Sequence, residues 1–372
     1  RQADLKVMTE TSVLTGRQVP GTVLSIDAMG GDLGPSAVVS GMAKAARKNP
    51  NLRFIVHGDG KTLNKLIAKR GDLKGRCDIR HCDDVVTMDA KPSQVVRHAK
   101  GSSMWSAVQA VENGEARAAV SCGNTGALMA LSMLRLRKIP GVNRPAIGVL
   151  WPSRNPSGFN VMLDVGADIR ADAQDLLHFA LMGSAYARSG LDQSRPRVGI
   201  LNVGTEEHKG RTELHDAYDL VARAAPAADF EFVGFVEGGD IPSDKVDVIV
   251  CDGFTGNAAL KTGEGTARLI REFLREAFEY SILSRLAAVM AYSSLKRLQK
   301  RIDPRRVNGG VFLGLNGTVV KSHGSADGTG VAAAIKLAAR LAAADFADQL
   351  TKRIAEAETA ADQIVHGEGK QA

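Results

Sequence analysis

Cysteine and aromatic residues are scarce in this chain of 372 residues, which has four cysteines and only 5% Phe, Trp and Tyr. The cysteines form no C-x-x-C pair, so neither the disulfide framework of a small secreted domain nor a structural zinc site is expected. Four unpaired thiols indicate a reduced, cytoplasmic setting. Few aromatics together with abundant Gly and Ala favour helices packed closely on a parallel sheet over a β-sandwich.

Long apolar runs are also missing. No stretch approaches the roughly 18–20 apolar residues that cross a bilayer, and the amino terminus lacks the layout of a signal peptide. We therefore predict a protein that is soluble or attached only to a membrane surface. Residues 1–21 have no clear period and are predicted to be a disordered extension, and residues 366–372 a frayed tail. Residues 22–365 are predicted to form one α/β catalytic domain.

Charge is unevenly distributed. The net charge is +7, and a single segment between residues 285 and 306 holds seven basic residues and one acid, Asp303. A local basic patch indicates an acidic partner or an anionic membrane surface, whereas a nucleic-acid-binding protein is usually basic more widely. Nucleic acid is therefore not an expected partner. The basic residues are Arg285, Lys296, Arg297, Lys300, Arg301, Arg305 and Arg306.

Predicted strands and helices alternate along the chain, which is typical of a mostly parallel sheet covered on both faces. The predicted strands lie at 22–27, 53–57, 116–121, 146–150, 159–164, 197–203, 230–236, 246–251 and 311–315. The predicted helices lie at 35–48, 102–113, 127–137, 171–189, 213–224, 257–277 and 330–363.

Short turns rich in Gly, Asn, Asp and Thr follow several of these strands. The carboxyl ends of parallel strands point toward one crevice, and glycine lets backbone N–H groups approach an anion. The turns therefore predict one polar site for a phosphate-like ligand, and hence an enzyme. They lie at 26–32, 121–126, 163–168, 202–210, 252–257 and 321–324.

Each turn also has a simpler explanation. The adjacent glycines Gly30 and Gly31 do not fit the dinucleotide pattern G-x-G-x-x-G, and a Gly-Gly pair is often only a tight turn. Asn124, Thr125 and Gly126 could form an anion-binding nest or merely cap a helix. Cys122 is interpreted as a small buried residue rather than a nucleophile, because no histidine is near in sequence to activate it.

The loop at 206–209 contains Glu-Glu-His-Lys directly after a buried strand. Lys209 would offer a cation for phosphate, although charged strings of this kind are commonly solvated surface. His208 and His215 are seven residues apart, which matches no standard ligand pair, so no metal is expected.

Residues 276–306 combine apolar side chains with the basic run. Two short helices in a hairpin could insert the apolar tip into a bilayer, with the basic residues at the headgroups. A helix pair at a dimer interface explains the same pattern equally well.

Taken together, several motifs resemble those of the bacterial phosphate acyltransferase family of phospholipid synthesis. The resemblance covers residues from about 22 to 345. It is carried by Ile-Asp-Ala-Met-Gly-Gly-Asp-Leu-Gly-Pro from Ile26, Lys-Pro-Ser-Gln from Lys91, Ser-Cys-Gly-Asn-Thr-Gly-Ala-Leu-Met from Ser121, Asn-Val-Gly-Thr-Glu-Glu-His-Lys-Gly from Asn202, Cys-Asp-Gly-Phe-Thr-Gly-Asn from Cys251 and Lys-Ser-His-Gly from Lys321. Cys122 and Asp168 depart from the family, which usually has alanine and asparagine there.

The resemblance implies a three-layer α/β/α fold shared with isopropylmalate dehydrogenases and phosphotransacetylases, and usually a homodimer. It implies transfer of a long-chain fatty acyl group from acyl carrier protein to inorganic phosphate, without a cofactor. The acyl phosphate would then serve a membrane-bound glycerol-3-phosphate acyltransferase. It also implies a cytoplasmic location with peripheral attachment to the inner face of the cell membrane, which favours the membrane interpretation of residues 276–306.

Phosphate is already a nucleophile, so positioning should dominate the mechanism. We expect Lys209, Asn257 and His323 to be catalytic: Lys209 as a cation for phosphate, Asn257 as a donor to the oxyanion, and His323 in an assisting role. The residues expected to bind phosphate or substrate, or to orient those that do, are Asp27, Gly30, Gly31, Asn124, Thr125, Gly126, Asp164 and Lys321. Arg97, Lys100 or the basic run would meet the acidic acyl carrier protein.

Three alternatives remain at this point. The first is a phosphotransacetylase-like enzyme that uses acyl-CoA. The second is a hydroxyacid dehydrogenase on a related fold, although no dinucleotide fingerprint is visible. The third is a non-catalytic membrane scaffold whose function lies in the basic segment.

Overall fold

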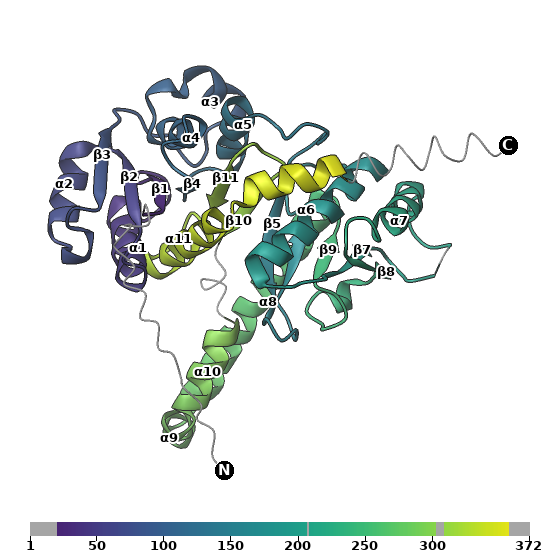
Figure 1. The fold of residues 1–372 in the computed structure, drawn as a ribbon. Helices are drawn as coiled ribbons and strands as arrows, with labels where there is room; N and C mark the ends of the chain where they lie inside the picture. Colours follow the sequence, from purple (N-terminus) through teal and green to yellow (C-terminus); the bar gives the residue numbers. More distant parts are fainter. Residues whose placement is uncertain (1–20, 207, 303–308, 357–372) are drawn as a thin grey trace, which may run out of the picture.

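A computed structural model describes residues 21–206, 208–302 and 309–356 of the chain. The predicted extension at 1–21, apart from Gly21, and the predicted tail at 366–372 lie outside the described residues. Most of the described residues form a body in which helices cover a central sheet, and a helical arm projects away from that body (Figure 1).

One sheet of eleven strands runs through the body in the order β3-β2-β1-β4-β11-β10-β5-β6-β9-β7-β8. The strands are β1 (Val23–Asp27), β2 (Arg53–Gly58), β3 (Cys77–His81), β4 (Ala118–Ser121), β5 (Ala146–Pro152), β6 (Phe159–Leu163), β7 (Arg197–Leu201), β8 (Glu231–Val236), β9 (Val248–Val250), β10 (Gly310–Leu313) and β11 (Thr318–Lys321). The short strands β3 and β11 are not among those predicted from sequence.

Strand direction reverses across the sheet. β10 is antiparallel to both β11 and β5, and β5 is antiparallel to β6, whereas the remaining pairs are parallel. The strands β6, β9, β7 and β8 therefore run opposite to β1–β4 and β11. The expectation that all the glycine turns share one edge of the sheet is wrong, because the carboxyl ends of the two halves point in opposite directions.

Helices form a layer on each face of this sheet, so the predicted three-layer α/β/α fold is confirmed. Apolar residues of α1, α6, α7 and α11 pack in one core, and those of α3, α4, α5 and the first turns of α8 pack in the other. The helices are α1 (Gly34–Lys48), α2 (Gly60–Ala68), α3 (Pro92–His98), α4 (Ser103–Glu112), α5 (Thr125–Leu136), α6 (Ala173–Leu191), α7 (Thr212–Ala224), α8 (Gly253–Glu279), α9 (Ile282–Met290), α10 (Tyr292–Ile302) and α11 (Gly328–Ala343).

The arm consists of the outer half of α8 together with α9 and α10 (Figure 1). Apolar side chains on it are strongly exposed, and Tyr280 and Ile282 reach 90% and 85%. No helix in the described part of the chain is both long and apolar enough to cross a bilayer. The arm therefore presents an exposed apolar surface, a feature that often marks a protein or membrane contact.

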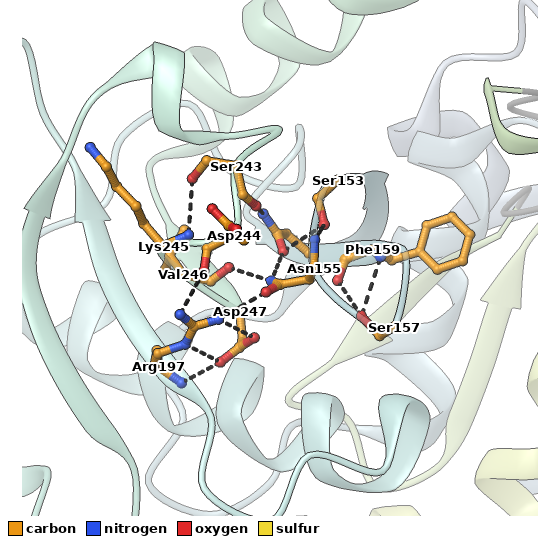
Figure 2. Close-up of polar contacts among 11 residues, drawn as sticks. Ser153, Asn155, Ser157, Phe159, Arg197, Ser243, Asp244, Lys245, Val246 and Asp247 are labelled. Carbon is orange, nitrogen blue, oxygen red and sulfur yellow. Dashed lines mark hydrogen bonds and ion pairs between the residues drawn. The ribbon is translucent and has the colours of Figure 1, made fainter. Parts of the chain in front are cut away.

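A buried polar network lies at the start of β7 and just before β9 (Figure 2). This is the opposite end of these strands from the turns at 202–210 and 252–257. Arg197, at the start of β7, binds both carboxylate oxygens of Asp247, with Nε at 3.0 Å from Oδ2 and Nη2 at 3.1 Å from Oδ1. Its Nη2 also donates to Asn155 Oδ1 at 2.8 Å, and Asn155 Nδ2 donates to the Val246 carbonyl at 2.8 Å. These contacts hold the loop after β5 against β7 and β9 and serve the fold rather than the site.

His57, at the end of β2, is a second buried polar residue with a structural role. Ser25 Oγ donates to the Ala107 carbonyl, so it accepts from His57 Nε2 at 2.9 Å, while Ser106 Oγ lies 2.7 Å from Nδ1. Burial lowers the pKa of His57 from 6.5 to about 4, with a smaller contribution from Arg80. The imidazole is thus neutral in the folded protein at pH 7.

We expect His57 to make folding sensitive to acid. Above pH 6.5 neither the folded nor the unfolded state protonates it, so it has no effect there. Between pH 6.5 and 4 only the unfolded state takes the proton, which lowers the free energy of unfolding by up to about 3 kcal/mol. Urea unfolding at pH 7 and pH 4.5 measures this loss. His57→Gln should reduce the difference in the free energy of unfolding between the two pH values, and His98→Gln, at an exposed position, should not. An equal difference in both variants would contradict the prediction.

Candidate active site

Asp27 connects the turns at the carboxyl ends of β1 and β4. Its buried carboxylate accepts hydrogen bonds from Ser103 Oγ at 2.7 Å, from Ser121 Oγ at 2.6 Å and from the Met29 amide at 3.3 Å. Ser121 Oγ in turn accepts from the Gly123 amide at 3.0 Å. Asp27 therefore lies behind the turns and fixes their backbone.

Gly30 and Gly31 permit an unusually close approach of two backbones. A Cβ atom on Gly30 would lie 2.6 Å from the Gly123 nitrogen, and one on Gly31 would lie 2.8 Å from Cys122 Cβ. Gly31 also has a φ of +95°, which side chains disfavour. The Asp32 amide donates to the Gly324 carbonyl at 2.8 Å, so the turns after β1, β4 and β11 pack against one another.

Asn124 caps α5 with its side chain. Its Oδ1 accepts from the Ala127 amide at 2.9 Å, and its Nδ2 donates to the carbonyls of Met88 and Ala90 at 2.7 and 3.1 Å. These side-chain contacts are those expected if Asn124 caps the helix. The next two residues, Thr125 and Gly126, are exposed at the amino end of α5, where the helix dipole favours an anion.

Cys122 behaves as a core residue. Its side chain is buried, and burial raises the pKa of the thiol to about 11. At neutral pH it is a thiol rather than a thiolate, which supports the interpretation of Cys122 as a small buried residue.

Lys321 brings a buried cation to this group of turns. Its side chain ends β11, and its Nζ donates to the carbonyls of Cys122, at 3.4 Å, and Ser322. Burial lowers its pKa to about 8, and the carboxylates of Asp27 and Asp32 act in the opposite direction. The ammonium therefore holds two of the turns together and supplies positive charge beneath them.

His323 follows two residues later. Its Nδ1 accepts from the Ser325 amide at 3.3 Å and contacts Ser325 Oγ at 2.8 Å, which leaves the ring proton on Nε2. Burial lowers its pKa, Lys261 and Lys321 lower it further, and Glu264 acts in the opposite direction. The residue is thus a neutral imidazole at pH 7.

Helix α8 connects the two halves of the sheet. It begins after β9, where Asp252 Oδ1 accepts from the Thr255 amide at 2.8 Å. Asn257 is exposed and lies against Gly166, 3.7 Å from the position that a Cβ would take there. One turn later on the same face, Lys261 lies near enough to His323 to affect its pKa. The helix thus brings Lys261, one turn after Asn257, toward Lys321 and His323, although α8 follows a strand of the other half of the sheet.

Asp164 organises the turn after β6. It is fully buried and accepts from the amides of Ile147 at 2.9 Å, Gly166 at 3.2 Å and Asp168 at 2.8 Å. Burial raises its pKa, and the amides counteract that shift. Asp164 therefore orients a loop and does not itself face solvent.

Lys209 is not brought to the Gly30 turn by any contact among the described residues. Its Nζ lies 2.7 Å from Glu206 Oε1, and both side chains are largely exposed. Asn202 Nδ2 donates to the Lys209 carbonyl at 2.9 Å and so holds the loop. Lys209 is thus a surface cation in the turn that follows β7.

Four residues near the site were not predicted from sequence. Ser103 and Ser121 were detectable, because serines beside a buried strand-end aspartate are natural donors to it. Lys261 and Glu264, whose Nζ and Oε2 lie 2.9 Å apart, had no sequence signal because they depend on where α8 crosses the sheet. Asp168, the departure from the family pattern, lies 2.9 Å from Arg144 Nη1, so its charge is paired.

The structure defines a three-layer α/β/α protein with the fold of solved phosphotransacetylases. The structure resembles a phosphotransacetylase from Streptococcus pyogenes with a TM-score of 0.59, at 17% identity over 87% of this chain and 94% of that one. It also resembles a branched-chain phosphotransacylase from Enterococcus faecalis V583 with a TM-score of 0.54, at 15% identity over 86% and 99% of the two chains. At these identities the likeness concerns the fold alone.

Sequence comparison defines the family more narrowly. Residues 22–349 match the family described as fatty acid synthesis protein. A phosphate acyltransferase of Jannaschia sp. (strain CCS1) is 71% identical over 97% of this chain and 99% of its own length, and one of Paracoccus denitrificans (strain Pd 1222) is 71% identical over 92% and 93%. The chain therefore belongs to the phosphate acyltransferase family, as its motifs indicated.

Proposed function

We propose that this enzyme transfers a long-chain fatty acyl group from acyl carrier protein to inorganic phosphate, forming acyl phosphate for phospholipid synthesis. Family membership supports acyl transfer to phosphate. The observation that carries the proposal is the set of glycine turns packed against buried Lys321, a group of backbone donors and one cation without the G-x-G-x-x-G pattern of a dinucleotide site.

The mechanism we infer depends on positioning. Phosphate binds at the exposed amino end of α5, beside the Gly30–Gly31 turn, with Lys321 as its countercharge. One phosphate oxygen attacks the thioester carbonyl carbon, so that a C–O bond forms and the C–S bond breaks. Asn257 donates to the oxyanion, and the neutral His323 lies nearby to donate a hydrogen bond from Nε2. The thiol has a reference pKa near 8.5, so it leaves readily as thiolate and takes its proton from water.

Lys209, predicted as a cation for phosphate, follows β7 and lies at the opposite edge of the sheet from the Gly30 turn, so it has no part in this mechanism.

The test is phosphate-dependent release of free acyl carrier protein from a long-chain acyl carrier protein thioester, with acyl-CoA as a parallel substrate. Turnover of the carrier thioester that disappears without phosphate supports the proposal. Turnover of acyl-CoA alone assigns the chain to phosphotransacetylase-like chemistry, and no turnover with either substrate contradicts the proposal.

We further infer that acyl carrier protein docks beside the Asn124 turn. Arg97 and Lys100 are exposed there, and Asn124 Nδ2 holds the loop that leads into α3. Such a docking by opposite charges weakens with salt, so Arg97→Ala with Lys100→Ala should raise the KM for the carrier thioester and reduce its salt dependence.

The arm is our candidate for both the homodimer contact and attachment to the inner face of the cell membrane. Its exposed apolar residues include Phe273 on α8 and Leu283 and Met290 on α9, with Arg285 among them. Attachment would deliver acyl phosphate to a membrane-bound glycerol-3-phosphate acyltransferase.

Leu283→Asp should abolish co-sedimentation with anionic vesicles if α9 meets lipid. Phe273→Asp should lower the mass in solution if α8 forms the dimer.

A further inference from the structure

A pocket of about 270 Å³ lies beside α5, outside the polar residues assigned above. Its wall is formed by Met129 and Met133 of α5, by Pro145 and by Ala167, with Arg144 and Asp168 at its polar side. Resting on the proposed function, we propose that this pocket binds the alkyl chain of the acyl substrate and that Met133 limits the chain length accepted.

Helix α5 links the pocket to the proposed anion site. Thr125, Met129 and Met133 are spaced by four residues, so they lie on one face of the helix. Thr125 stands at the amino end, where phosphate is proposed to bind. At 1.5 Å per residue, Met133 is about 12 Å farther along the helix axis. A chain attached to a carbonyl beside Thr125 could therefore extend over Met129 to Met133.

The other wall belongs to the turn that meets Asn257. Ala167 and Asp168 directly follow Gly166, the residue against which Asn257 lies. The Ala167 amide donates to both carboxylate oxygens of Asp164 at 3.0 Å, so this wall is held by a buried group. The pocket thus adjoins the turn against which the proposed oxyanion donor Asn257 lies.

The chemistry of the lining suits an alkyl chain. Methionine is unbranched and flexible, and it adapts to chains of different shape. The two charged residues neutralise each other, because Arg144 Nη1 lies 2.9 Å from Asp168 Oδ2. Burial of each methylene group against such a surface is favourable, which makes length discrimination possible.

Filling the pocket tests the proposal. Met133→Trp should lower the ratio of kcat/KM for a sixteen-carbon thioester to that for a six-carbon one by at least about tenfold, since each excluded methylene loses its burial. Leu134→Trp is the matched control: Leu134 is 47% exposed and Met133 41%, but Leu134 does not line the pocket. The ratio of kcat/KM for the two thioesters should be the same in Leu134→Trp as in the wild type.

A second variant guards against misfolding of the first. Met133→Ala enlarges the same end of the pocket and should shift the preferred chain to greater length. Unchanged length profiles in both Met133 variants, with wild-type turnover intact, would overturn the pocket assignment alone. Wild-type protein that releases no acyl carrier protein from either thioester in the presence of phosphate would instead overturn the proposed function.

Discussion

Lys321→Met is expected to lower kcat/KM for phosphate by about 10²–10³, the cost typical of losing one preorganised electrostatic contact. The substitution removes a buried positive charge and two hydrogen bonds, to the carbonyls of Cys122 and Ser322. Because the loss falls on binding of the anion, KM for phosphate should rise as well as kcat fall. Initial rates at varied phosphate and fixed carrier thioester measure both quantities.

The pH dependence distinguishes a charge effect from a structural one. The pKa of Lys321 lies at about 8, so its ammonium is charged below that pH and loses its proton above it. In the wild type, kcat/KM for phosphate should therefore decline as pH rises through 8, whereas Lys321→Met should lack this decline. Lys44→Met is the control, since Lys44 on α1 only donates to Thr329 at 2.9 Å on the surface. A Lys321→Met protein with the wild-type pH profile would show that the charge is not used.

Asn257→Ala is expected to lower kcat by about 10²–10³ while changing KM for phosphate little. An amide that donates to the oxyanion acts mainly in the transition state, and its loss therefore appears in kcat. Asn257 is exposed at the start of α8, so the variant should keep the thermal stability of the wild type. Single-turnover rates with the carrier thioester at saturating phosphate measure the chemical step.

Asn64→Ala provides the comparison for Asn257. Asn64 is also exposed on a helix, where its Nδ2 donates only to the Gly60 carbonyl at 2.8 Å. The control should retain full activity. If Asn257→Ala matched it, the oxyanion donor would have to be sought elsewhere, and the neutral His323 would be the next residue to replace.

Local sequence was sufficient for the layer architecture and for locating the turns that we propose as the site. Alternating apolar strands and amphipathic helices predicted an α/β sandwich, because burial on two faces of a sheet imposes that pattern. The glycines of the β1 turn were found for the same local reason: close approach of backbones demands residues without a side chain. Asp27 and Asp164, which were predicted to orient other groups, accept hydrogen bonds from the turns around them.

Other features had too weak a local signal. β11 is a run of four residues, too short to be distinguished by period, yet it lies between β4 and β10 at the centre of the sheet and carries Lys321. The Asn124 side chain caps α5 through the Ala127 amide and holds the loop before α3 through the Met88 carbonyl, contacts that the sequence did not reveal. Binding of phosphate by the Asn124–Gly126 amides stays a prediction.

The sequence by itself determined the fold class, the family and the residues able to bind an anion, because composition, period and turn chemistry are local properties. Only the tertiary structure decided which of these residues meet. The antiparallel strands β10 and β5 reverse half of the sheet, which separates Lys209 from the Gly30 turn. The first turns of α8 then place Lys261, one turn after Asn257, near His323. Strand direction and the path of a helix across the sheet join residues far apart in the chain, and no short motif encodes them.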